Sequence, residues 1–90
     1  MEFEFDSAKS QANKTKHGID FNEARALWED PDRLLFVARF QDEERHGIIA
    51  RYRTALWCAI FTYRQHIIRI ISVRRAREYE KEIYDYGGGF

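Results

Sequence analysis

The sequence predicts an α+β domain in which a small antiparallel sheet carries two N-terminal helices on one face and a C-terminal helix. Helix-capping signals fill the first third of the chain, and the middle is rich in β-branched and aromatic residues. The last residues return to a helical pattern that ends at glycines. The chain has 90 residues, of which 44% are hydrophobic, so residues 1–90 are expected to form a single domain with one core.

The N-terminal segment predicts a short strand followed by a helix. "FEFD" at 3–6 alternates apolar and acidic residues, and Asp6 is a good N-cap for a helix over 7–17. Gly18 stands where a glycine commonly ends a helix. The residues expected on the buried side of this helix are Ala8, Ala12 and the stem of Lys16.

A second helix is predicted to begin at Asp20. Glu23, three residues later, completes a capping box with it. Pro31 cannot continue a helix, so the helix is expected to end near Asp30. Its predicted buried stripe is Phe21, Ala24, Leu27 and Trp28.

The central part of the chain predicts four strands joined by short links. Links of this length require neighbouring strands to run antiparallel. The last two strands are apolar at nearly every position, so we expect them to lie inside the sheet. The four segments are 33–40, 46–52, 55–63 and 67–73.

A final helix is predicted over 74–86, with Arg74, Arg75 and Arg77 in its first turn. Positive charge at a helix N-terminus is unfavourable by about 0.3–1 kcal/mol per residue unless an anion binds there. This junction is therefore a candidate phosphate site. The predicted buried stripe of the helix is Ala76, Tyr79, Ile83 and Tyr86.

The net charge of zero conceals an uneven distribution. Residues 1–45 hold 7 basic and 11 acidic side chains, whereas residues 46–90 hold 8 and 4. No acidic residue lies between the first and last of eight arginines, so this part of the chain predicts an anionic partner. The alternative is a solvated surface neutralised by the acidic N-terminal half. The arginines are Arg45, Arg51, Arg53, Arg64, Arg69, Arg74, Arg75 and Arg77.

Cysteine usage and hydropathy predict a cytoplasmic protein. Cys58 is the single cysteine and lies in the apolar run "ALWCAIF", where it is expected to be a buried hydrophobic residue. No intramolecular disulfide is possible, which is typical of a reducing compartment. No secretion signal and no membrane-spanning stretch are predicted. No metal-binding or nucleotide-binding motif is present either.

Several motifs, in order and at family-like spacing, resemble the BrnT family of bacterial toxins, whose fold is similar to that of the RelE and ParE toxins. The resemblance implies a ribonuclease that needs no cofactor and inhibits translation by cutting RNA. It also implies a BrnA-like antitoxin with a ribbon-helix-helix domain, which alone would contact operator DNA, and no membrane partner. The motifs are "FEFD" with Lys9 and Asn13, "KHGIDFNEA", "WEDP", "DEER" and "IRIISVRRA".

Metal-free RNA cleavage needs a base, an acid and cations, which limits the candidate residues. His17 is either a plain helix-terminal residue or, as part of the family's "KHG" motif, a proton donor or acceptor. Tyr52 and Tyr63 either stack on RNA bases or pack across strands. The predicted catalytic residues are Lys16, His17, Arg74 and Arg75. The predicted RNA-binding residues are Arg51, Arg53, Arg64, Arg69 and Arg77.

Two other functions remain open at the level of sequence. One is a ParE-like toxin that acts on a protein such as a topoisomerase. The other is a non-catalytic module whose basic surface binds nucleic acid. Cleavage of purified RNA in EDTA separates the ribonuclease from both.

Overall fold

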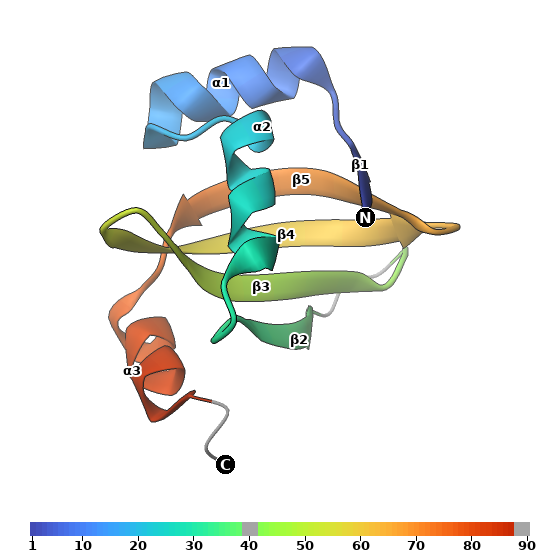
Figure 1. The fold of residues 1–90 in the computed structure, drawn as a ribbon. Coiled ribbons are helices and arrows are strands. Elements are labelled where there is room, and N and C mark those ends of the chain that lie inside the picture. Colours follow the sequence, from blue (N-terminus) through green and yellow to red (C-terminus); the bar gives the residue numbers. More distant parts are fainter. Residues whose placement is uncertain (39–41, 88–90) are drawn as a thin grey trace.

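The computed structural model describes residues 1–38 and 42–87, and Figure 1 shows their arrangement. Five strands form one sheet in the order β1-β5-β4-β3-β2. The strands are β1 (Glu2–Glu4), β2 (Leu34–Ala38), β3 (Arg45–Tyr52), β4 (Ala55–Arg64) and β5 (Ile67–Arg75). The helices are α1 (Ser7–His17), α2 (Phe21–Ala24), the 3₁₀ helix η1 (Arg25–Glu29) and α3 (Glu78–Tyr86).

The sheet confirms the four antiparallel strands but is mixed rather than antiparallel. Strands β2 to β5 pair antiparallel, with β4 at the centre and β5 beside it, as predicted. Strand β1, however, pairs parallel with β5 at the edge. The pattern of a short strand does not indicate which distant strand it joins, so this pairing was not predicted. Residues 39 and 40 of the expected strand 33–40, and the last two glycines of the "GGG" stop, lie outside the described residues.

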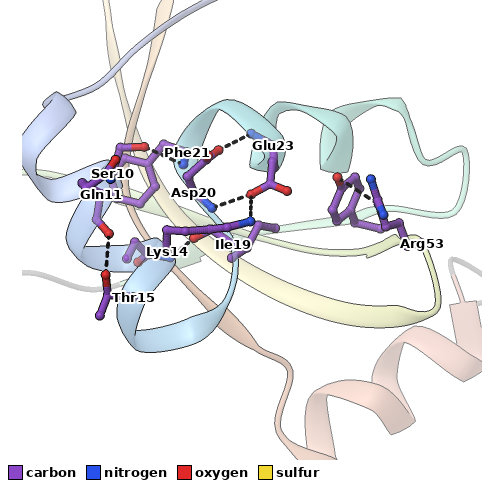
Figure 2. Close-up of polar contacts among 11 residues, drawn as sticks. Ser10, Gln11, Lys14, Thr15, Ile19, Asp20, Phe21, Glu23 and Arg53 are labelled. Carbon is purple, nitrogen blue, oxygen red and sulfur yellow. Dashed lines mark hydrogen bonds and ion pairs between the residues drawn. The ribbon is translucent and has the colours of Figure 1, made fainter.

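Both N-terminal helices begin as the sequence predicts. The Asp6 carboxylate accepts a hydrogen bond of 2.9 Å from the Lys9 amide at the start of α1, and Gly18 ends that helix with φ of 86°. Asp20 and Glu23 form the reciprocal capping box, with N–H···O distances of 2.7 and 3.0 Å (Figure 2). The second helix then tightens into η1, which ends before Asp30.

The larger core lies between the sheet and the N-terminal helices. All four residues of the predicted stripe on α2 and η1 are buried, and the Trp28 ring packs edge-on against Phe3 and Phe61 at centroid distances of 5.1 Å. Trp57 and Cys58 are buried as predicted, and burial raises the pKa of Cys58 to about 12. A smaller core lies on the opposite face under α3 and includes Cys58 and Tyr84.

The predicted buried side of α1 is wrong. Ala8, Ala12 and Lys16 are exposed, whereas Ser10 and Asn13 are buried. These two polar side chains satisfy backbone groups that would otherwise be buried without hydrogen bonds, which is why they face inward. An apolar count along the helix could not reveal this.

The predicted start and buried stripe of the last helix are also wrong. Arg74 and Arg75 continue β5, where they pair with Cys58 and Trp57, and α3 begins only at Glu78. Its first turn therefore carries glutamates, which suit the helix dipole. The buried side chains of α3 are Glu80 and Tyr84, whereas Tyr79, Ile83 and Tyr86 are exposed; Ala76 is buried but precedes the helix. No helix in the described part is long and apolar enough to cross a membrane.

Candidate active site

Three elements meet at one end of the sheet: the C-terminal end of α1, the β3–β4 hairpin and the C-terminal end of β5 (Figure 1). A cleft of about 290 Å³ opens there. We call it the basic cleft, because three of its side chains are cationic and one is acidic. It is lined by Lys14, Gly18, Glu23, Tyr52, Arg53, Thr54, Ala55, Trp57 and Arg75.

Within the described part of the chain, the Arg75 side chain has no ion pair and no hydrogen bond. It is exposed near the end of β5, and its guanidinium carbon lies 5.3 Å from the ring centroid of Trp57. No described carboxylate lies within salt-bridge distance of it. The buried Trp57 indole N–H also lacks an acceptor among the described residues. Arg75 can therefore bind an incoming anion without breaking an existing ion pair.

Arg53 enters the cleft from the tight turn between β3 and β4. Its Nε donates a 3.2 Å hydrogen bond to the Tyr52 hydroxyl, and its guanidinium carbon lies 5.4 Å from that ring. The backbone of Arg53 has φ of 57°, but Gln65 in the other hairpin has φ of 59°. This conformation therefore belongs to the tight hairpins and is not by itself a sign of function.

Lys14 and Glu23 form an ion pair between α1 and α2 at the wall of the cleft. Figure 2 shows the Lys14 ammonium reaching the Glu23 carboxylate, at 2.7 Å. The hydrogen bond between them raises the pKa of Lys14 and lowers that of Glu23, so both are charged at neutral pH. The Asp20 amide of the capping box donates to the same carboxylate oxygen, Glu23 Oε1. A carboxylate thus sits at a fixed place beside the cleft cations.

The two predicted catalytic residues of the "KHG" motif lie next to the cleft but do not line it. His17 is half-buried and Lys16 is exposed, both at the end of α1. The glycine that follows them does line the cleft. Neither side chain has a hydrogen bond or ion pair within the described part of the chain.

Arg74 lies on the opposite face of the sheet from Arg75, because successive side chains of a strand alternate. Its two terminal nitrogens donate to the two carboxylate oxygens of Glu80, at 2.7 and 3.0 Å. This hydrogen bonding raises the pKa of Arg74. The expected helix-start phosphate site is therefore not present in this form: Arg74 anchors α3, while Arg75 faces the cleft.

The predicted RNA-binding arginines do not form one surface. Arg53 lines the cleft, but Arg51 lies over the Tyr84 ring at 5.6 Å, and Arg77 precedes α3. Arg69 pairs with Glu4 at 2.6 Å, so its charge is not unopposed. Because β4 runs from Ala55 to Arg64 and a strand rises about 3.4 Å per residue, Arg64 lies about 30 Å from the cleft end.

Sequence reasoning did not single out Lys14 and Glu23 as site residues. The sequence contains a signal for each residue. Lys14 stands one helical turn before Gly18, which ends α1, and Glu23 is the acidic residue of the capping box. Their ion pair depends on the angle between two helices, which local patterns do not give. In the described ranges, 1–38 and 42–87, no group of three or more His, Cys, Asp or Glu side chains is placed to hold a metal ion.

The fold and the cleft define a small α+β protein with a cation-rich cleft at one end of its sheet. Comparison with known families gives a specific assignment: a family model described as the ribonuclease toxin, BrnT, of a type II toxin-antitoxin system matches residues 5–80. The match covers most of the 90 residues, so the chain belongs to this family. A search of curated proteins finds no match.

Proposed function

We propose that this protein cleaves RNA in the basic cleft without a metal ion and thereby inhibits translation. The family makes it a ribonuclease toxin of a type II system. The observation that supports the site is Arg75, an exposed guanidinium in the cleft with no described acidic partner. An enzyme acting on phosphodiesters needs such a group to receive the negative charge of the phosphate.

In the proposed reaction, the RNA 2′-oxygen loses its proton to a base and attacks the adjacent phosphorus. The bond from phosphorus to the 5′-oxygen breaks, and that oxygen takes a proton from an acid. The products are a 2′,3′-cyclic phosphate and a 5′-hydroxyl end. Arg75 and Arg53 would bind the phosphoryl oxygens, because guanidinium groups hold them with two parallel hydrogen bonds.

His17 is the side chain that we propose for proton transfer, with Lys16 as an electrostatic helper. Histidine changes its charge near neutral pH, and His17 lies one residue before a cleft-lining glycine. Glu23 is the other group at the cleft that can accept a proton. Its ion pair with Lys14 favours the charged carboxylate, so we assign it to orienting Lys14 rather than to proton transfer.

The path of the RNA strand is proposed to continue into a second cleft of about 600 Å³. The two clefts share Glu23 and Tyr52, and the second also contains Asn22, Arg25 and Trp28. Tyr52 is half-buried against the core, so its ring has a fixed position on which an unpaired base could stack.

The test is RNA cleavage by purified Arg75→Ala in EDTA. We expect cleavage to fall about 10²–10³-fold, as is typical for removal of one transition-state donor, with an unchanged melting temperature. Arg75→Lys should restore little of the cleavage activity, because an ammonium group does not reproduce the planar fork of the guanidinium group. Arg64→Ala is the matched control, since Arg64 is an exposed arginine at the far end of β4.

Two results would contradict this site or this activity. Full cleavage by Arg75→Ala would exclude the phosphate role of Arg75. RNA left intact by the wild-type protein in EDTA, with DNA supercoiling disturbed, would instead favour a ParE-like toxin. The RelE-like fold, the cytoplasmic location and the BrnA-like ribbon-helix-helix antitoxin, through which alone operator DNA would be bound, remain parts of the proposal.

A further inference from the structure

An apolar groove lies between the edge strand β2 and helix α3, away from the basic cleft. Its volume is about 450 Å³. Large apolar side chains are exposed in and around it: Leu35 is 55% exposed, Ile83 is 44% exposed and Tyr79 is 55% exposed. Glu80, which is paired with Arg74, is also part of the lining. Exposed apolar surface that gathers in one place is typical of a protein interaction site.

Strand β2 offers backbone groups as well as apolar side chains. It pairs only with β3 among the described strands, so no described strand covers its outer edge. Its sequence, LLFVA, has neither the charged residue nor the proline that commonly protects an edge strand. The Phe36 ring lies over Gly47 of β3, where a Cβ atom would collide with it. This contact holds the Phe36 ring in the position where it lines the groove. An open apolar edge is suited to adding a strand from a partner.

Exposed acidic side chains on α3 favour a basic partner. Glu82 and Asp85 are exposed on this helix, which forms one wall of the groove. The acidic residues 42–44, just before β3, are exposed as well, although Glu43 lies 3.6 Å from Arg45 and Glu44 lies 3.5 Å from His46. Lys81 is a nearby base but pairs with Glu78 at 3.4 Å. RNA would be repelled here, and a second copy of the chain would oppose acidic residues with acidic residues. A peptide with basic residues beside apolar ones would be attracted.

We propose that the antitoxin docks here, with an extended segment pairing along the outer edge of β2. Alternate apolar side chains of that segment would enter the groove between β2 and α3. Its basic residues would lie beside the exposed acidic groups of α3. This inference rests on the proposed function only in that it takes the antitoxin of the type II system as the partner.

The experiment measures antitoxin binding and RNA cleavage on the same protein preparations. Leu35→Lys places a charge on the edge strand, and Ile83→Lys places one on α3. Calorimetry should show that the purified, full-length cognate antitoxin binds at least about 10-fold more weakly to each variant. The bound segment must cover the new charge, which lies at the strand edge in Leu35→Lys and in the groove in Ile83→Lys. RNA cleavage by the free variants should be unchanged. Tyr63→Lys, at a 50% exposed aromatic near the far end of β4, is the control and should bind normally.

Hydrogen exchange tests strand addition directly. The outward-facing amides of Leu34–Ala38 should gain protection when the antitoxin binds, whereas a partner that only contacts side chains would leave them exchanging. Unchanged antitoxin affinity in both lysine variants would overturn the proposal. A dimer of the free protein that Leu35→Lys dissociates, with normal antitoxin binding, would assign the groove to a second copy. Failure of the wild type to cleave RNA would refute the proposed activity while leaving the binding result valid.

Discussion

Helices α1 and α3 lie on opposite faces of the sheet and are attached to it by different chemistry. Helix α1 is attached by neutral polar groups: Asn13 donates to the carbonyls of Ile19 and Val73 at 2.8 and 3.0 Å and accepts from the Val73 amide at 3.2 Å. Ser10 accepts from the Phe21 amide at 2.9 Å. The apolar side chains of this helix are small and point to solvent.

Helix α3 is attached by charged groups and one tyrosine. Glu80 receives the hydrogen bonds of Arg74, and the Tyr84 hydroxyl donates to Asp30 at 2.8 Å. Its large apolar side chains are left exposed instead of being used for attachment. The difference indicates that α1 is a fixed wall of the basic cleft, while the exposed face of α3 is available to a partner.

The largest effect is expected from Asn13→Ala in α1. The change leaves the Val73 amide and two buried carbonyls without hydrogen bonds, which should cost about 3 kcal/mol of unfolding free energy. For a domain of this size the melting temperature should fall by about 10–20 °C. Thermal and urea unfolding would measure it, with Asn22→Ala, an exposed asparagine, as the control expected to stay within about 0.5 kcal/mol. Equal losses in the two variants would show that α1 is not held by this side chain.

Asn13 also shows how far the sequence could predict the fold. The caps Asp6, Gly18 and Asp20 act through residues three or four positions away, so the sequence predicts them correctly. The hydrogen bonds of Asn13 with Val73 join residues 60 positions apart in the chain, and no local pattern reports them. The same reason explains why the parallel pairing of β1 was missed.

The sequence predicts too early a start for α3, because Arg74 and Arg75 are equally compatible with the first turn of a helix and with the end of a strand. Arg74 and Arg75 have strand partners, and the period of two sends them to opposite faces. The sequence could thus indicate that the arginines near this junction are candidates for a functional site. It could not assign Arg75 to the cleft and Arg74 to Glu80, since that depends on strand register. The ion pair of Lys14 with Glu23 was missed because it depends on the packing of two helices.

A middle-sized, pH-dependent effect is expected from Glu80→Gln in α3. Burial alone would raise the pKa of Glu80, but the hydrogen bonds from Arg74 and the Arg77 amide outweigh it and lower the pKa. A lowered pKa in the folded state stabilises the protein above the unfolded value of 4.5, and this stabilisation is lost as the pH falls through the folded pKa. The variant should therefore lose about 2 kcal/mol at pH 7.

Urea unfolding at several pH values would measure this loss. The difference between Glu80→Gln and wild type should shrink below pH 4.5, as protonation removes the charge from the wild-type side chain as well. Glu78→Gln is the matched control, because that carboxylate is 88% exposed on the same helix and should contribute little at any pH. If the difference in unfolding free energy between Glu80→Gln and wild type stayed constant down to acid pH, side-chain packing and not charge would hold α3 in place.

The smallest effect is expected from Tyr79→Ser, at the exposed apolar face of α3. The Tyr79 side chain is 55% exposed, so its removal returns little buried apolar area to water, and tyrosine and serine have similar helix propensities. The unfolding free energy should change by less than about 0.5 kcal/mol. Tyr84→Phe on the buried side is the comparison: it removes only a hydroxyl, yet it should cost more, about 1 kcal/mol, because that hydroxyl binds Asp30. If Tyr79→Ser proved the more destabilising change, the apolar face of α3 would be part of the folded core and would not be free for a partner.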